Sequence, residues 1–331
     1  MSFFTIDNVG PVVNSEGQTF HAASRLSSRK HFIILRISMS DSTITYNQAI
    51  TGIIGRRFSC RHYDPRPIEP GLRDQLSEML SASSTGPLGT RMRFELVSAG
   101  DGDLTALKGL GTYGFIKGAS GFIIGAVGQG EYNMEDYACL LERAVLFATD
   151  IGLGTCWLGG TFRKSGFSRK ISLKETEILP AAVAVGYVAD KPRWFDSYMR
   201  RRAGSDNRLP WAELFFDGTF RTPLSTDTAG PFVTPLEMIR LGPSASNKQP
   251  WRVIRDGTQW HFYVQRTSGY GRRNTTLFHL ADMQRIDMGI AMCHFELTLR
   301  EMGLSGQWIH AQPGIEKPDE LTEYIVTWQG K

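Results

Sequence analysis

The sequence predicts an α+β protein in which one structural unit occurs twice in degenerate form. Short apolar segments bounded by glycine alternate with amphipathic helical segments, a pattern typical of mixed helix and strand content. Two strong helical segments, at 134–152 and 285–303, both end in Gly-Leu-Gly/Ser-x-x-Trp. The chain of 331 residues is long enough for one large domain or two small ones.

The first copy begins with two predicted helices and two predicted strands. In residues 43–55 the apolar side chains fall on one helical face, and we expect this helix to end at Gly55. A second amphipathic helix is predicted at 70–83. The segments 92–99 and 121–127 are short, apolar and bounded by glycine, as β-strands are.

The strongest helical pattern of the chain lies at 134–152. Two carboxylates stand in its first turn, where they stabilise the helix dipole, and Gly152 is the expected C-terminal cap. A tight glycine-rich turn and a buried strand at 179–189 follow. Residues 191–232 are polar with scattered Pro, Trp and Arg, which predicts a long connection on the surface.

The second copy repeats this order. Placing Gly303 on Gly152 gives an offset of 151 residues. The same offset pairs three further identical residues: Asp287 with Asp136, Leu304 with Leu153, and Trp308 with Trp157. Strand-like segments at 249–257 and 324–330 hold the places of the first and last strands of the first copy. The alternative is two generic amphipathic helices that each end in glycine.

Charge and hydropathy narrow the function classes. The 37 basic and 33 acidic residues leave a net charge of only +4, which argues against nucleic-acid binding despite the Arg run at 200–202. The apolar run at 32–37 contains Arg36 and is far shorter than the roughly 20 residues of a membrane span. We therefore expect a cytoplasmic protein without membrane contact. Residues 1–40 are polar and Ser-rich, and we expect a poorly structured extension there.

Two apparent motifs carry little weight. The four cysteines show no CxxC pair and no metal-ligand spacing, so free thiols and no metal site are expected. Cys156 as a nucleophile is the alternative, although no base lies near it in sequence.

Residues 109–114 match Gly-x-Gly-x-x-Gly, but a strand-like segment follows where dinucleotide binding requires a helix. A loop turn is the better interpretation.

Two other motifs occur once each, one in each half. RFSCR at 57–61 places two guanidiniums beside a hydroxyl, which suits a phosphate and an anionic ring edge. A solvated basic loop is the alternative. PSASNKQPW at 243–251 offers hydroxyls and amides to a planar heterocycle. The first half has only a worn version, SASSTGPLGT at 81–90, which lacks the Asn and Gln.

Together these motifs resemble the nitroreductase family of flavin-dependent oxidoreductases. Members carry R-x-S-x-R/K, a helix ending in GLGTCW-h-G-G, and P-S-x-x-N-x-Q-P-W; this chain has RFSCR, GLGTCWLGG and PSASNKQPW. The single-chain duplication resembles the subset named putative TM nitroreductases, in which one polypeptide looks like a fused family dimer. The resemblance covers 43–331 and implies a nitroreductase-like tandem pseudo-dimer, with mixed central sheets flanked by helices. Its first half would be 41–195, its connecting segment 196–232 and its second half 233–331.

The resemblance also implies a cofactor site. In that family FMN lies in the dimer interface, so one FMN would lie between the two halves of this chain. Arg57 and Ser59 would contact the phosphate, and Arg61 the ribityl chain or pyrimidine edge. Backbone N–H groups near the flavin N5 would come from Leu158, Gly159 and Gly160. The second half would contribute Pro243, Ser244, Ser246, Asn247 and Gln249. A phosphate contact would also come from the run Arg200, Arg201 and Arg202, and the sequence leaves open which of them makes it.

The implied activity is the reduction of small electron-poor compounds, such as nitroaromatics or quinones. NAD(P)H would be the donor and would dock transiently over the flavin. Each intact motif has one intact complement in the other half, so we expect one working flavin site per chain, a second decayed site, and a monomer. The alternative is a flavin- or nucleotide-binding protein without turnover.

Overall fold

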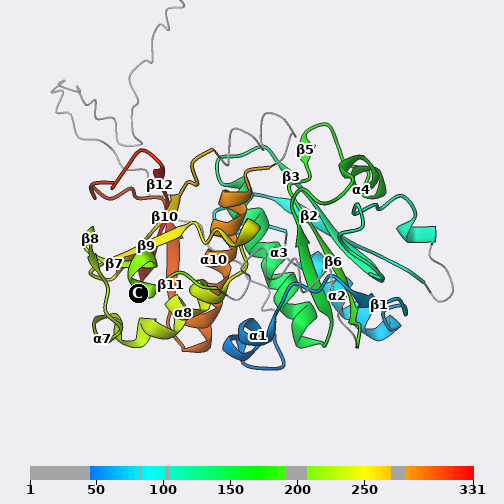
Figure 1. The fold of residues 1–331 in the computed structure, drawn as a ribbon, viewed down its shortest axis with the longest axis horizontal. Coiled ribbons are helices and arrows are strands. Elements are labelled where there is room, and N and C mark those ends of the chain that lie inside the picture. Colours follow the sequence, from blue (N-terminus) through cyan, green and yellow to red (C-terminus); the bar gives the residue numbers. More distant parts are fainter. Residues whose placement is uncertain (1–44, 83, 101–104, 191–206, 270–280) are drawn as a thin grey trace, which may run out of the picture. The chain divides into compact units, whose positions relative to one another are not determined.

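The structure is a computed structural model that describes residues 45–82, 84–100, 105–190, 207–269 and 281–331. Within these residues, two six-stranded sheets lie on either side of a central helix pair, α3 (Asn133–Asp150) and α10 (Met283–Glu301) (Figure 1). The expected N-terminal extension at 1–40 and the arginine run at 200–202 lie outside the described residues.

The two sheets share a four-stranded antiparallel order. The first runs β4 (Gly154–Leu158), β6 (Ala182–Val188), β3 (Gly121–Gly128), β2 (Met92–Ser98). The second runs β11 (Gly306–Ile309), β12 (Thr322–Gly330), β10 (Gln259–Gln265), β9 (Trp251–Asp256). This is the arrangement that two copies of one unit would give.

Short strands complete each sheet. In the first sheet β1 (Tyr63–Asp64) pairs with β6, and β5 (Glu177–Ile178) pairs with β3. In the second sheet β7 (Phe215–Asp217) pairs in parallel with β9, and β8 (Thr219–Pro223) pairs with β7. The second sheet is therefore mixed, whereas the named strands of the first sheet are all antiparallel.

The strongest predicted helices are confirmed. They correspond to α2 (Pro70–Ala82), α3 and α10, and the positive φ angles of Gly152 (88°) and Gly303 (72°) end α3 and α10 as expected. The first predicted helix is shorter, α1 (Ile50–Arg56), because the chain before it is held by a tertiary contact. There Asn47 N donates to Asp150 Oδ2 over 2.6 Å.

Several strands were missed, β4 and β10 among them. Residues 154–158 were interpreted as part of a glycine-rich turn, but they form β4 because they pair with β6 along their whole length. The strand β10 has no glycine at its ends, and its aromatic residues pair with both β9 and β12. Residues 109–114 form a loop before β3, in agreement with the turn interpretation.

The expected surface connection contributes to the second half. Its described part contains α6 (Trp211–Leu214), β7, β8, α7 (Thr226–Ala229) and the 3₁₀ turn η2 (Gly230–Phe232). Leu214 and Phe215 are fully buried in the core of the second half. The segment therefore extends the second sheet by two strands and leads directly into α8 (Val233–Leu241).

Three short elements lie in the loops. They are η1 (Thr105–Leu107), α4 (Lys164–Lys170) and η3 (Ala245–Asn247).

None of the described helices is long and apolar enough to cross a membrane. Within the same residues, no three His, Cys, Asp or Glu side chains are grouped so as to hold a metal ion.

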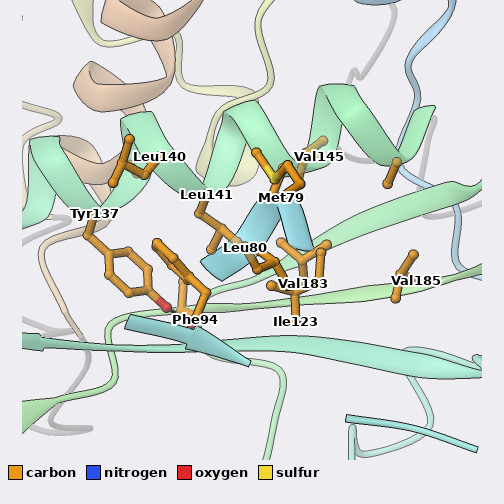
Figure 2. Packing of buried hydrophobic residues seen from close by; sticks show 14 of the residues in the cluster. Met79, Leu80, Phe94, Ile123, Tyr137, Leu140, Leu141, Val145, Val183 and Val185 are labelled. Atoms are coloured by element: carbon orange, nitrogen blue, oxygen red, sulfur yellow. Dashed lines mark hydrogen bonds between the residues drawn. The ribbon is translucent and has the colours of Figure 1, made fainter. Parts of the chain in front are cut away.

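The core of the first half lies between its sheet and the helices α2 and α3. Figure 2 shows apolar side chains of both helices, such as Met79 and Leu141, directed at strand residues such as Ile123 and Val183. Tyr137 crosses this layer, and its hydroxyl donates to the Ala181 carbonyl over 2.6 Å. A buried hydroxyl with a partner costs little, so Tyr137 can add its large apolar surface to the core.

The two halves meet where α10 crosses α3. A Cβ at Gly289 would lie 2.2 Å from the Glu135 carbonyl oxygen and 2.7 Å from the Ala138 Cβ. Only glycine allows the two helix backbones to approach this closely. Most side chains of both helices are buried, since each packs against its partner and against a sheet.

Gly289→Ala should destabilise the fold by about 2 kcal/mol or more, because the added methyl overpacks a contact between two backbones. Gly52→Ala is the matched control, since Gly52 lies in helix α1 and a Cβ added there would have no atom within 4 Å. It should be neutral or stabilise by up to ~1 kcal/mol. Urea denaturation measures both, and equal midpoints for Gly289→Ala and the wild type would contradict the close contact.

Candidate functional site

Two of the predicted motifs lie side by side. Residues 57–61 run along β4, where Ser59 forms a parallel bridge with Thr155 and Cys60 N donates to the Thr155 carbonyl over 2.8 Å. The RFSCR segment and the GLGTCWLGG segment therefore form one surface of the first half.

Arg57 points inward from this surface. Its side chain is only 6% exposed, and its Nε lies 3.9 Å from Oε1 of Glu142 on α3. Burial lowers the pKa of Arg57, while the nearby Glu142 opposes that change. Its Nε has no hydrogen-bond partner among the described residues. Arg61 takes a different direction, with its guanidinium over the Phe115 ring at 5.1 Å from the centroid.

Glu142 joins three parts of the protein. It is fully buried and accepts a hydrogen bond from Trp157 Nε1 of the GLGTCW segment over 2.7 Å. Its other oxygen lies 3.0 Å from Nε2 of His294 on α10. The other ring nitrogen of His294 lies 2.8 Å from the Met238 carbonyl of α8. Both ring nitrogens thus lie within hydrogen-bond distance of an oxygen atom.

Sequence reasoning missed Glu142. Its only sequence signal was a Glu-Arg pair within the most regular apolar helix of the chain, where a charge needs a buried partner. The partner, His294, lies 152 residues away in the sequence. No local pattern could have paired them.

The second half holds a matching carboxylate. Glu296 on α10 is buried and accepts from Trp308 Nε1 over 2.8 Å. Arg143 on α3 and Arg300 lie 3.3 and 2.6 Å from its Oε1. Each half therefore supplies a buried glutamate that contacts its own tryptophan and a basic residue from the other half, His294 or Arg143.

The loop at 243–249 has an unusual backbone. Ser246, Asn247 and Gln249 have φ angles of 52°, 52° and 48°, in the left-handed region that residues other than glycine rarely adopt. The loop is held by Ala245 N, which donates to Asp287 Oδ1 over 2.9 Å, and by Gln249 N, which donates to Ser244 Oγ over 2.9 Å. Such strain is concentrated at functional sites.

Two predicted ligand side chains of this loop already have protein partners. Asn247 accepts from Arg208 over 3.1 Å and donates to the Asn207 carbonyl over 2.9 Å. Gln249 is buried and accepts from Leu209 N over 2.9 Å. Both amides hold the segment 207–209 against the loop, so their contact with a flavin stays a prediction. Pro243 and Ser244 are half-buried, and Ser246 is exposed.

The two halves approach each other at the glycine turn. A Cβ at Gly159 would lie 2.5 Å from Cε of Met283, the first residue of α10. Within the second half, a Cβ at Gly242, the residue before the loop, would lie 3.6 Å from His294 Nδ1. Leu158 is buried, whereas Gly159 is half-buried and Gly160 exposed, and neither glycine donates its N–H to a described partner.

The pair of residues that corresponds to Gly159 and Met283 at the other junction of the halves has different side chains. The 151-residue offset places His310 where Gly159 stands and Tyr132 where Met283 stands. The His310 and Tyr132 rings lie 5.4 Å apart. A cavity of about 420 Å³ lies beside them, lined by residues 88–91 and 128–132. No segment of the RFSCR type accompanies this cavity in the sequence of the second half.

Comparison with known proteins gives one family and one shared fold. The family model described as Putative TM nitroreductase matches residues 49–299. A putative nitroreductase from Thermotoga maritima MSB8 is similar in structure, with a TM-score of 0.52, 17% identity, and coverage of 88% of this chain and 98% of that chain. Comparison with curated proteins finds no match.

Other solved structures align with a smaller part of the chain. A nitroreductase family protein from Clostridium difficile 630 has a TM-score of 0.36 and 16% identity, covering 50% of this chain and 95% of its own. A nitroreductase with bound FMN from Bacteroides fragilis NCTC 9343 has a TM-score of 0.34 and 18% identity, covering 44% and 92%.

Glu142→Ala should destabilise the protein by on the order of 3–5 kcal/mol, because it leaves the buried Arg57 and His294 without their carboxylate. Glu237→Ala removes a more exposed carboxylate that pairs with Arg240 on α8, and should change stability by no more than ~1 kcal/mol. Chemical denaturation of both variants measures the difference. Similar losses in the two would show that the buried contacts of Glu142 contribute little.

Proposed function

Because the chain belongs to the Putative TM nitroreductase family, we propose that it is an FMN-dependent oxidoreductase whose flavin lies between the two halves. The observation that carries this proposal is the contact chain from Arg57 through Glu142 and His294 to Met238. It joins the cationic motif of the first half to the helix that leads into the 243–249 loop.

The donor set suits this cofactor. Arg57 is a buried cation whose Nε lacks a hydrogen-bond partner within the described residues, and a phosphate would supply one. The N–H groups of Gly159 and Gly160 are likewise available to a ring acceptor.

Each group has a proposed role. Arg57 and Ser59 bind the phosphate, as does one residue of the 200–202 run, and Arg61 places positive charge at the pyrimidine edge. The N–H groups of 158–160 hold the ring near N5, and the 243–249 loop covers it from the second half. When bound, FMN supplies the hydride and electron transfer that side chains cannot perform. No side chain is assigned as a general acid, since water can supply the substrate proton.

The proposed substrates are small electron-poor compounds such as nitroaromatics and quinones, with NAD(P)H as the donor. A protein that binds flavin without turnover is the second candidate, favoured by the loss of one of two symmetry-related sites. Anaerobic absorbance separates the two. Bleaching of the bound flavin by NADH or NADPH, followed by recovery with a quinone, supports the enzyme, and a flavin spectrum that neither donor changes supports the binding protein.

We also propose an oligomeric state and a cellular location for the protein. One chain supplies both walls of the pocket, so we propose a monomer, which light scattering can test. The four cysteines are buried free thiols, which suits the reducing conditions of the cytoplasm.

Arg57→Ala should weaken FMN binding by roughly 10- to 100-fold while leaving riboflavin binding unchanged, because the lost contact is a charge-assisted hydrogen bond to phosphate. Flavin fluorescence titration with the two ligands measures the ratio. Arg221→Ala is the control, since Arg221 is an exposed arginine whose side chain is 84% accessible. An equal loss for FMN and riboflavin would place Arg57 away from the phosphate.

The flavin content should be one FMN per chain. Only the first half has the cationic motif, and His310 stands where the flavin-facing Gly159 stands in the other site. The measurement is the absorbance of flavin released by denaturation from FMN-saturated, desalted protein of known concentration. A ratio near two would show that the cavity beside His310 also binds flavin.

A further inference from the structure

Asp287 and Asp136 hold corresponding positions in α10 and α3, but their hydrogen bonds differ. Both oxygens of Asp136 accept a backbone N–H from the first-half loop, from Leu88 and Thr90, each over 2.7 Å. Asp287 accepts only one, from Ala245 over 2.9 Å. Its Oδ2 is buried and has no hydrogen-bond partner among the described residues.

The two loops also differ in backbone strain. In the described part of the first-half loop, 84–90, the positive φ falls on Gly89, which tolerates it. The second-half loop carries positive φ at three residues that have side chains. The loop that makes fewer bonds to its aspartate is therefore also the more strained one.

Besides the bond to Asp287, contacts with another segment hold the strained conformation. The amides of Asn247 and Gln249 bind the segment 207–209. If the loop moved toward Asp287, these two amides would need new partners. The edge of a flavin ring offers both donors and acceptors to an amide.

We propose that the 243–249 loop has a second conformation, in which a further backbone N–H binds Asp287 Oδ2, and that flavin binding selects it. The proposal rests on the proposed function, because the flavin provides the new partners for Asn247 and Gln249. Asp287 then acts as a positioning residue. In the second conformation both of its oxygens would accept a backbone N–H, as those of Asp136 do in the first half. A ligand shifts such an equilibrium by as much as its affinity differs between the two conformations.

The burial of Asp287 also favours the second conformation of the loop. Asp287 is 1% exposed, and burial raises the pKa of its carboxyl well above the usual range, with a smaller contribution from the nearby Asp282. A second N–H donor would oppose this effect, as the two donors do in part for Asp136, whose pKa burial still raises to about 6.

The test is a pair of matched variants, Asp287→Asn and Asp136→Asn. An asparagine at 287 keeps an oxygen for Ala245 N but places an NH₂ donor where the second N–H must bind. Flavin-free Asp287→Asn should therefore melt no lower than the wild type, while its FMN and riboflavin affinities both fall roughly tenfold or more. Asp136→Asn loses one of two existing bonds, so it should melt lower and bind FMN as the wild type does.

Hydrogen exchange of a peptide covering 241–250 gives the second readout. FMN should slow exchange in the wild type and not in Asp287→Asn at equal saturation. This comparison in the wild type tests the loop even if the variant does not fold. Unchanged FMN affinity in Asp287→Asn overturns the proposal. So does a loss of affinity in this variant when FMN still slows hydrogen exchange of 241–250 as much as in the wild type. Wild-type protein that binds neither FMN nor riboflavin would instead overturn the proposed function itself.

Discussion

The close packing of α10 on α3 is the contact on which the rest of the structure depends. Gly289 lets the helix backbones approach, and the residues around it then lie too deep for water to solvate their charges. Glu142 and Glu296 consequently need partners across the helix pair, and they find them in His294 and Arg143. Because removing one partner of a buried pair is strongly destabilising, these contacts fix how the halves join.

The same contact determines where a site can form. His294 of the second half contacts both Glu142 of the first half and the Met238 carbonyl of α8, so the helix that leads into the 243–249 loop is linked to the first half through His294. The motif RFSCR is positioned by β4 and by Arg57 beside the same glutamate. A flavin bound between these segments would contact two halves that are already connected through buried charges.

Much of the fold could be predicted because its determinants are local. Apolar periodicity and terminal glycines predicted α2, α3 and α10, and the 151-residue offset predicted a repeated unit, with which the shared strand order of the two sheets is consistent. β4 and β7 could not be found this way, since each is defined by pairing with a distant strand. In the site, motif positions were predictable, but Glu142 was not, and the existing partners of Asn247 and Gln249 depend on a distant segment.

The reciprocal glutamate pairs also bear on how the chain is synthesised. Glu142 leaves the ribosome 152 residues before His294. At typical rates of synthesis this delay is about ten to thirty seconds, during which the first half exposes a helix face built for a partner that does not yet exist. The strand β7, which belongs to the sheet of the second half, must wait for β9 in the same way. A chain of this design therefore completes its second core only after β12 has been synthesised, and the first half must stay unaggregated until then.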